Sequence, residues 1–445
     1  MSQHYLNVLF SPKSVAVFGA SAQADKVGTI VFKNMLENFQ GEVFGINPKR
    51  PEIGGKQTFA TLDEVAGPVE LAVIATPATT IPDIIDACGR HGVKAAIILS
   101  AGFSETGAKG AALQKSVVET AKLYGIRLLG PNCLGIMRPG TGLNATFYNG
   151  SAQAGSLALV SQSGALCTAI LDWAHGNGVG FSSVVSMGTS ADIDFGEILD
   201  YLLSDAQTES ILLYVEGIHL ARSFVSALRA AARIKPVIVV KVGRHKTGTQ
   251  AAISHTGALV GSDDVFDATL RRAGVVRVNT IAQLFTAAQA LASHNRPSGN
   301  RLAIITNGGG PGAMAADRVA DLGSELAPLS ADSLARLDAF LPATWSHGNP
   351  LDIIGDASSE RYRETVKVCM EDANVDGVLV ILTPQAMTRP LEVAEAVLEA
   401  GKAYNKPLVA CWMGGREVTA GRRVLPRSPT PRSRAPEPAV EAFSY

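Results

Sequence analysis

Short apolar segments rich in β-branched residues alternate with segments of helical periodicity, and this alternation constrains the fold more than any other feature. Each apolar segment is long enough for one buried strand, and each intervening segment has room for a helix. Strands joined by helices in this way form a parallel sheet with helices on its faces. The first series predicts strands at residues 15–18, 42–46, 71–75, 95–99 and 126–129.

Two further series of the same kind follow, and the second and third both open with a strand, a small-residue turn and a helix. We therefore predict three consecutive α/β domains, at residues 1–142, 150–294 and 300–415. A polar segment with Pro and Gly, residues 294–300, separates the last two domains. Residues 416–445 are rich in Arg and Pro without a period, so we expect an irregular tail there.

Composition excludes several classes of protein. Hydrophobic residues make up 47% of the chain and charged residues 18%, which is enough apolar material for several buried cores. Lys and Arg number 39 against 40 for Asp and Glu, so no net positive charge is present to hold nucleic acid or an anionic membrane. No segment reaches the ~18 consecutive apolar residues of a membrane helix. Five separated cysteines without a CxxC pair favour a soluble, cytoplasmic protein and give no sign of a metal site.

The first predicted strand runs into Gly19-Ala20-Ser21, and Gly28 follows just before a helix. A glycine turn at a helix N-terminus presents free N–H groups to a phosphate. The GxGxxG fingerprint is absent, and the second strand ends in Asn47-Pro48-Lys49 rather than in an acid that would hold a ribose. Lys49 suits an additional phosphate, so coenzyme A fits better than NAD, and an NAD-dependent oxidoreductase is disfavoured. An ordinary tight turn with a surface lysine remains the alternative.

Small or polar residues also follow three other predicted strands of the first domain. Ligands of open α/β sheets bind at the carboxyl ends of the strands, so these residues are expected to face one crevice. Cys133 has no activating base nearby in the sequence, and we interpret it as a packing residue or a backbone contact rather than a nucleophile. The candidate coenzyme A residues at these strand ends are Thr76, Pro77, Ser100, Ala101, Gly102, Asn132 and Cys133.

His255 stands in a Ser-His-Thr-Gly sequence whose small neighbours leave the imidazole free to meet a partner. Ser161, Ser163 and Gly164 end a strand and begin a helix, which makes a second anion cradle with hydroxyl groups as well as amides. Because Ser161 replaces the first glycine of a GxSxG elbow, Ser163 is not interpreted as a hydrolase nucleophile. Glu216 ends an apolar strand and could orient an imidazole. These are the parts that an enzyme with a phosphohistidine needs.

In this order, the motifs resemble those of the acyl-CoA synthetases that form a nucleoside diphosphate, and of succinyl-CoA synthetase. The resemblance spans residues 8–415 and includes Gly188, the Asn-Gly-Gly-Gly-Pro-Gly turn at 307–312 and Asn-Pro-Leu-Asp at 349–352. It implies a Rossmann-like CoA-binding domain followed by two flavodoxin-like domains. It also implies that His255 is the phosphorylated histidine and Glu216 its partner. By the same resemblance, Ser161, Ser163, Gly164 and Gly188 would bind phosphate or an acyl phosphate.

The reaction implied by the resemblance converts an acyl-CoA, phosphate and ADP into a carboxylate, CoA and ATP. Acetyl-CoA would be the substrate, and an ATP-grasp partner, a β subunit or a downstream domain, would hold ATP or ADP with Mg²⁺. An oligomer is expected. Residues 435–445 look like the lead-in to a further domain, so a free-standing α subunit and a truncated fusion protein both stay open.

A second function also stays open at this point. Residues 170–174 and 192–202 resemble a bacterial branch in which this region is fused to ATP-grasp and GNAT acetyltransferase domains. The chain could then be a non-catalytic regulatory remnant of a protein lysine acetyltransferase that binds acetyl-CoA. Some members of that branch lack the histidine, so the presence of His255 favours a ligase.

Overall fold

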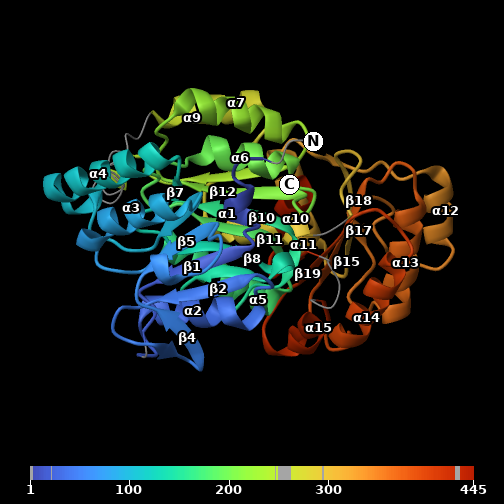
Figure 1. The fold of residues 1–445 in the computed structure, drawn as a ribbon. Helices are drawn as coiled ribbons and strands as arrows, with labels where there is room; N and C mark the ends of the chain where they lie inside the picture. Colours follow the sequence, from blue (N-terminus) through green and yellow to red (C-terminus); the bar gives the residue numbers. More distant parts are fainter. Residues whose placement is uncertain (1–3, 22, 246, 249–261, 293–294, 426–430) are drawn as a thin grey trace. The chain divides into compact units, whose positions relative to one another are not determined.

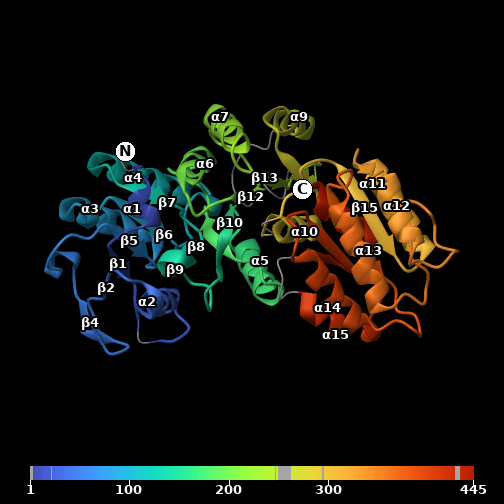
Figure 2. The same cartoon turned by 90° about the vertical axis from the view of Figure 1, so that its right-hand side faces the viewer.

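The computed structural model describes the chain except for residues 1–3, 22, 246, 249–261, 293–294 and 426–430. The chain divides into two compact units, Met1–Asn279 and Thr280–Tyr445. Both are α/β units, drawn in Figures 1 and 2. Among the described residues, no helix is long and apolar enough to cross a membrane.

The first sheet of the first unit has the strand order β3-β4-β2-β1-β5-β6-β7. All five predicted strands are present and parallel to one another. Alternate residues of β1 face opposite layers: Val15 and Val17 lie in the core with α2, whereas Ala16 and Phe18 lie with α3 and α4. The strands are β1 (Ser14–Phe18), β2 (Glu42–Ile46), β3 (Glu52–Ile53), β4 (Lys56–Phe59), β5 (Leu71–Ile74), β6 (Ala95–Ile98) and β7 (Arg127–Leu129). The helices are α1 (Asn7–Phe10), α2 (Val27–Asn38), α3 (Ile81–His91) and α4 (Ala108–Tyr124).

The second sheet of this unit has the order β14-β13-β12-β10-β11-β8-β9. Strands β10 to β14 are parallel, whereas β8 pairs antiparallel with both β11 and β9. The strands are β8 (Gly135–Arg138), β9 (Leu143–Thr146), β10 (Ala154–Ser161), β11 (Phe181–Ser186), β12 (Ser210–Val215), β13 (Val237–Lys241) and β14 (Val276–Val278). The helices are α5 (Gly164–Asn177), α6 (Phe195–Ser204), α7 (Ala221–Ala232) and α9 (Asp263–Ala273).

The chain enters the second sheet at β8, a few residues before the boundary predicted at residue 142. The chain leaves the first sheet after β7, turns at Gly130-Pro131, and already belongs to the second sheet at β8. The boundary itself stays a prediction: β8 and β9 are short strands joined by a turn, without an α-helix between them. The two sheets also share one core. Phe10 stacks on Tyr201 at 3.8 Å between ring centroids, and the buried Arg138 on β8 donates to Asp205 at 2.6 Å.

The second unit contains a parallel sheet of order β16-β15-β18-β19-β20, with β17 paired to β15. Its strands are β15 (Arg301–Thr306), β16 (Glu325–Leu326), β17 (Leu351–Asp352), β18 (Gly377–Leu382), β19 (Leu408–Trp412) and β20 (Arg432–Ser433). Its helices are α10 (Ile281–Ala292), α11 (Gly309–Asp321), α12 (Ala331–Asp338), α13 (Ser359–Glu371), α14 (Pro390–Gly401), α15 (Thr419–Val424) and α16 (Pro436–Ser444). Helix α10 belongs to this unit, although the sequence analysis placed it in the domain predicted at 150–294.

The prediction of an irregular tail at residues 416–445 was wrong for the described residues of that segment. They form α15, β20 and α16, and α16 buries Val440 and Phe443 in the core of the second unit. The Glu441 carboxylate accepts from Arg318 on α11 and from Gln283 on α10. The helix begins with Pro436 in its first turn, a position that proline favours. Its apolar residues have helical spacing, but the Arg and Pro content around them masked that period.

Candidate functional site

The glycine turn after β1 is packed too tightly for any side chain. Gly19 has φ +90°, and a Cβ atom there would lie 2.6 Å from the carbonyl oxygen of Ala75. A Cβ atom on Gly28 would lie 2.2 Å from the carbonyl oxygen of Gly19, so the first turn of α2 rests directly on the turn. The N–H groups of a helix's first turn have no partner within the helix. The two glycines therefore leave a helix N-terminus and a bare backbone, which fit a pyrophosphate.

Hydrogen bonds join the predicted coenzyme A residues at the carboxyl edge of the first sheet. Asn47 donates from Nδ2 to the carbonyl oxygen of Ala20 at 2.6 Å, and its Oδ1 accepts from the Lys49 amide at 2.8 Å. This bond network ties the turn after β2 to the turn after β1. The Lys49 side chain remains exposed to solvent. Asn47 is a residue to which the sequence analysis gave no role, although it follows β2 directly.

The turns after β5, β6 and β7 are tied together in the same way. The Ser100 hydroxyl donates to the carbonyl oxygen of Thr76 at 2.5 Å, and the Asn132 amide donates to the carbonyl oxygen of Ser100 at 3.0 Å. The Glu105 carboxylate closes the β6 turn by accepting from the Gly102 amide at 2.6 Å. Pro77 and Ala101 lie within these same turns. Glu105 was missed because it does not itself end a strand.

Cys133 has the character of a packing residue. Its side chain is buried, and Sγ donates to the carbonyl oxygen of Ile98 at 3.4 Å. Burial raises the pKa of the Cys133 thiol to about 12, so the thiolate that a nucleophile needs is not formed near neutral pH. The geometry agrees with the interpretation of Cys133 as a packing residue.

The turn between β10 and α5 closes on itself through two serines. The buried Ser161 hydroxyl donates to the carbonyl oxygen of Ser163 at 2.9 Å and accepts from the Ser163 amide at 3.0 Å. The Ser163 hydroxyl caps α5 by accepting from the Leu166 amide at 3.3 Å. A capping serine leaves the rest of the first turn able to bind an anion. A Cβ atom on Gly164 would lie 3.5 Å from Leu134, so the start of α5 lies beside the chain that leaves the first sheet.

Gln162 holds Glu216 next to the start of α5. The Gln162 Oε1 accepts from the amides of Glu216 and Gly217 at 2.7 and 3.0 Å. Its Nε2 donates to the carbonyl oxygen of Gly217 at 2.9 Å. Glu216 is buried directly after β12, the neighbour of β10 in the sheet. Gln162 was missed as a positioning residue, although its place between the two serines of the turn was the available signal.

The second unit contains a turn of the same design after β15. The Thr306 hydroxyl donates to the carbonyl oxygen of Gly308 at 2.9 Å and accepts from its amide at 3.1 Å. Asn307 then replaces Gln162, with Oδ1 accepting from the Thr383 amide and Nδ2 donating to the Thr383 carbonyl oxygen, each at 2.8 Å. The similar openings of the second and third predicted domains therefore reflect one common local structure.

The predicted phosphate turn and the last coenzyme A turn are in direct contact. Gly188 has φ +57°, and a Cβ atom there would lie 2.1 Å from the carbonyl oxygen of Pro131. The Thr189 amide donates to the same oxygen at 3.0 Å, and the Ala191 amide donates to the carbonyl oxygen of Gly130 at 3.0 Å. The structure thus brings Asn132 and Cys133 together with Gly188 and the start of α5.

His255 lies outside the described residues. Residues 249–261, which include it, lie between the end of β13 at the buried Lys241 and the start of α9. Lys241 pairs with Val215, the residue before Glu216, in the register of β12 and β13. Its Nζ donates to the carbonyl oxygen of Val242 at 3.1 Å and lies 3.8 Å from Asp263 Oδ1 on α9. The Lys241 ammonium therefore joins the end of β13 to the start of α9.

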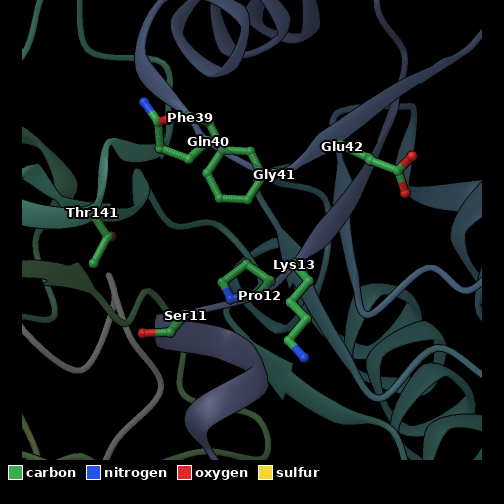
Figure 3. A pocket seen from close by; sticks show the side chains of 8 residues that line it. All are labelled: Ser11, Pro12, Lys13, Phe39, Gln40, Gly41, Glu42 and Thr141. Atoms are coloured by element: carbon green, nitrogen blue, oxygen red, sulfur yellow. The ribbon is translucent and has the colours of Figure 1, made fainter.

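A surface groove of about 630 Å³ lies elsewhere on the first unit (Figure 3). It runs between Lys13, just before β1, and Gly41 and Glu42 at the beginning of β2. This is the amino edge of the sheet, whereas ligands of open α/β sheets bind at the carboxyl edge. The groove is therefore separate from the candidate site.

Family models match three parts of the chain: a CoA-binding domain at residues 13–139, a succinyl-CoA ligase-like flavodoxin domain at 154–291 and a ligase-CoA domain at 302–425. The α subunit of ADP-forming acetate–CoA ligase II from Pyrococcus furiosus is 38% identical over 442 residues, covering 98% of this chain and 96% of the relative. The chain belongs to the ADP-forming acetate–CoA ligase family. A longer relative from Archaeoglobus fulgidus, ADP-forming acetate–CoA ligase I, is 44% identical over 98% of this chain, and this chain spans 62% of the length of that relative.

A solved structure of the same family matches the fold throughout. It is acetyl-coenzyme A synthetase 1 from Ca. Korarchaeum cryptofilum in complex with phosphate and ADP, with a TM-score of 0.95, 34% identity and coverage of 99% of this chain and 95% of that one. The predicted order of a CoA-binding domain and two succinyl-CoA-synthetase-type domains is confirmed. The matches support coenzyme A as the ligand of the first domain and favour the ligase over the regulatory remnant.

Proposed function

We propose that this chain is the α-type part of an ADP-forming acetate–CoA ligase. The overall reaction converts acetyl-CoA, phosphate and ADP into acetate, CoA and ATP. The observation that carries the proposal is the contact between the turn after β7 and Gly188, beside the start of α5. A thioester held at the carboxyl edge of the first sheet would there meet the N-terminus of a helix in the second.

The residues of the first sheet fit coenzyme A. The glycine turn at Gly19, Ala20 and Ser21 and the start of α2 would bind the pyrophosphate through backbone N–H groups. The exposed ammonium of Lys49 would bind the 3′-phosphate. The joined turns that carry Thr76, Pro77, Ser100, Ala101, Gly102, Asn132 and Cys133 would line the path of the pantetheine arm toward α5.

The start of α5 would bind the attacking phosphate. Ser161, Ser163, Gly164 and Gly188 surround a helix N-terminus, where backbone dipoles stabilise negative charge. Attack of a phosphate oxygen on the thioester carbonyl carbon forms the acyl phosphate and expels CoA as its thiolate. The same dipoles would stabilise the oxyanion that forms on the way.

His255 would then take the phosphoryl group and release acetate. One imidazole nitrogen attacks phosphorus while Glu216 accepts a hydrogen bond from the other nitrogen and fixes the tautomer. Gln162 supports this role of Glu216 because it holds the Glu216 amide at 2.7 Å. The phosphoryl group would pass to ADP, held with Mg²⁺ on an ATP-grasp β subunit or further domain. Such a partner is supported by the α-subunit relative and by the longer relative, of which this chain spans 62%.

The test is phosphoryl transfer to the purified chain, incubated with acetyl-CoA and ³²P-phosphate. We expect an acid-labile, base-stable label on the wild type and on His175→Ala, an exposed histidine control in α5. His255→Ala should carry no label while still binding CoA in a calorimetric titration. A wild type that binds CoA but takes up no label, or a label that persists in His255→Ala, would refute the proposed function.

A further inference from the structure

Ser190 combines two unfavourable features in the turn between β11 and α6. Its φ is +52°, which lies in the left-handed region that residues other than glycine, asparagine and aspartate seldom adopt. Its side chain is buried, with 8% of the residue exposed, and Oγ has no hydrogen-bond partner in the described part of the chain. Each feature by itself disfavours the folded state.

Glycine at this position would remove both penalties. It would accept the positive φ without strain, and it would leave no hydroxyl group to satisfy. The turn does use glycine two residues earlier, at Gly188, where any Cβ atom would collide with Pro131. No contact among the described residues calls for a hydroxyl at Ser190. A buried hydroxyl without a partner among the described residues, in a turn at the strand ends where ligands bind, points to a bound group.

The position of Ser190 suggests which group this is. Its amide donates to the carbonyl oxygen of Met187 at 3.2 Å, and the Met187 amide donates to the carbonyl oxygen of Ser161 at 2.8 Å. The two residues flanking Ser190 donate to the carbonyl oxygens of Gly130 and Pro131. Ser190 therefore lies in the turn that joins the start of α5 to the last turn of the CoA-binding sheet.

We propose that the Ser190 hydroxyl donates a hydrogen bond to an oxygen of the phosphate that attacks the thioester, and so is a substrate-contacting residue. This inference rests on the proposed function, because it uses the phosphate site at the start of α5. Binding of the phosphate would satisfy the Ser190 hydroxyl, which has no partner among the described residues. The strain at Ser190 is then a cost of the free enzyme that is offset when substrate binds.

Ser183 provides a matched control. It is also a serine of the same sheet with a buried Oγ that lacks a partner in the described part of the chain. It lies within β11, in an extended strand rather than in the turn at the strand ends. Removing the Ser183 hydroxyl should not change the phosphate concentration needed for labelling of His255.

The experiment compares Ser190→Gly, Ser190→Ala and Ser183→Ala with the wild type. For the Ser190 variants, we expect the midpoint of thermal unfolding to rise by about 1–3 °C. The phosphate concentration for half-maximal labelling of His255 should increase about tenfold or more, the effect of losing a hydrogen bond to a charged group. The Kd for CoA should not change. Ser183→Ala should keep the phosphate dependence of the wild type.

The failure of this inference can be separated from the failure of the proposed function. If the wild type is labelled and the Ser190 variants keep its phosphate dependence, the inference is overturned and the proposed function stands. If the wild type takes up no label, the inference is tested instead by the increase in the midpoint of thermal unfolding that inorganic phosphate causes. A smaller rise in the Ser190 variants than in Ser183→Ala then supports the inference, and an equal rise overturns it.

Discussion

Replacing Gln162 with leucine should destabilise β12 and separate Glu216 from the start of α5. The Gln162 side chain makes three hydrogen bonds, to two amides and one carbonyl group of Glu216 and Gly217. Both partner residues are buried, so water does not replace the lost bonds. Leucine has a similar volume, and the change therefore removes the bonds without opening a large cavity.

The expected loss of stability follows from the amides of Glu216 and Gly217, which lose their acceptor in the variant. A buried donor left without a partner costs about 1–3 kcal/mol, so the two together predict about 2–6 kcal/mol. Asn307→Leu breaks the matching bonds in the second unit. Its partner Thr383 is only half-buried, so the loss there should be smaller.

Native-state hydrogen exchange of peptides from β12 and β18 measures each unit separately. Gln162→Leu should lower the opening free energy of β12 by the amount above and leave β18 unchanged. Gln40→Leu, at an exposed glutamine, is the control and should change neither by more than about 0.5 kcal/mol. A decrease below about 1 kcal/mol in β12 would show that Gln162 does not hold Glu216 in place.

Three further predictions concern other contacts. Gly188→Ala should lower the midpoint of thermal unfolding and the rate of His255 labelling, because the new Cβ atom would lie 2.1 Å from the carbonyl oxygen of Pro131. Gly176→Ala is the control and should not destabilise the chain, because its Cβ atom would enter open space. Equal midpoints of thermal unfolding in the two variants would contradict this prediction. Phe443→Ala should lower the opening free energy of β18 by about 3–5 kcal/mol, because the Phe443 ring is buried against Gly377. Unchanged hydrogen exchange of the β18 amides would contradict the packing of α16 in this core. The Arg301 guanidinium lowers the pKa of Asp376 to about 2, so this carboxylate stabilises the fold above the pKa of the unfolded chain and loses that effect as pH falls toward 2. Asp376→Asn should therefore have a lower free energy of unfolding than the wild type in denaturant titrations at pH 6. The difference between the two free energies should become smaller from pH 4 toward pH 2, and a constant difference would contradict this prediction.

The strands and the glycine turns could be predicted from the sequence because both are local signals. Five parallel strands lie where the apolar segments indicated them, and the turn at Gly19 requires glycine by its φ. The sequence marks Gln162 only by its place between two serines, and its partners are more than fifty residues away in the chain. A bond between a side chain and a distant backbone leaves no periodic pattern.

Composition misled the analysis at the C-terminal end. The arginines and prolines of residues 416–445 predicted an irregular tail, yet Val440 and Phe443 carry enough apolar surface to hold α16 in the core. The change of sheet before residue 142 left no such sign in the sequence, because β8 and β9 are too short to give a period of their own. The assignment of His255, outside the described residues, stays a prediction.

The central claim is that acetyl-CoA and phosphate together load a phosphoryl group onto His255. The most direct measurement follows free CoA thiol and protein-bound ³²P in the same quenched samples. The account predicts one CoA released for each phosphate bound, no release without phosphate, and no bound phosphate in His255→Ala. Release of CoA without protein-bound phosphate in the wild type would contradict it, because the thioester would then be hydrolysed rather than used to phosphorylate the chain.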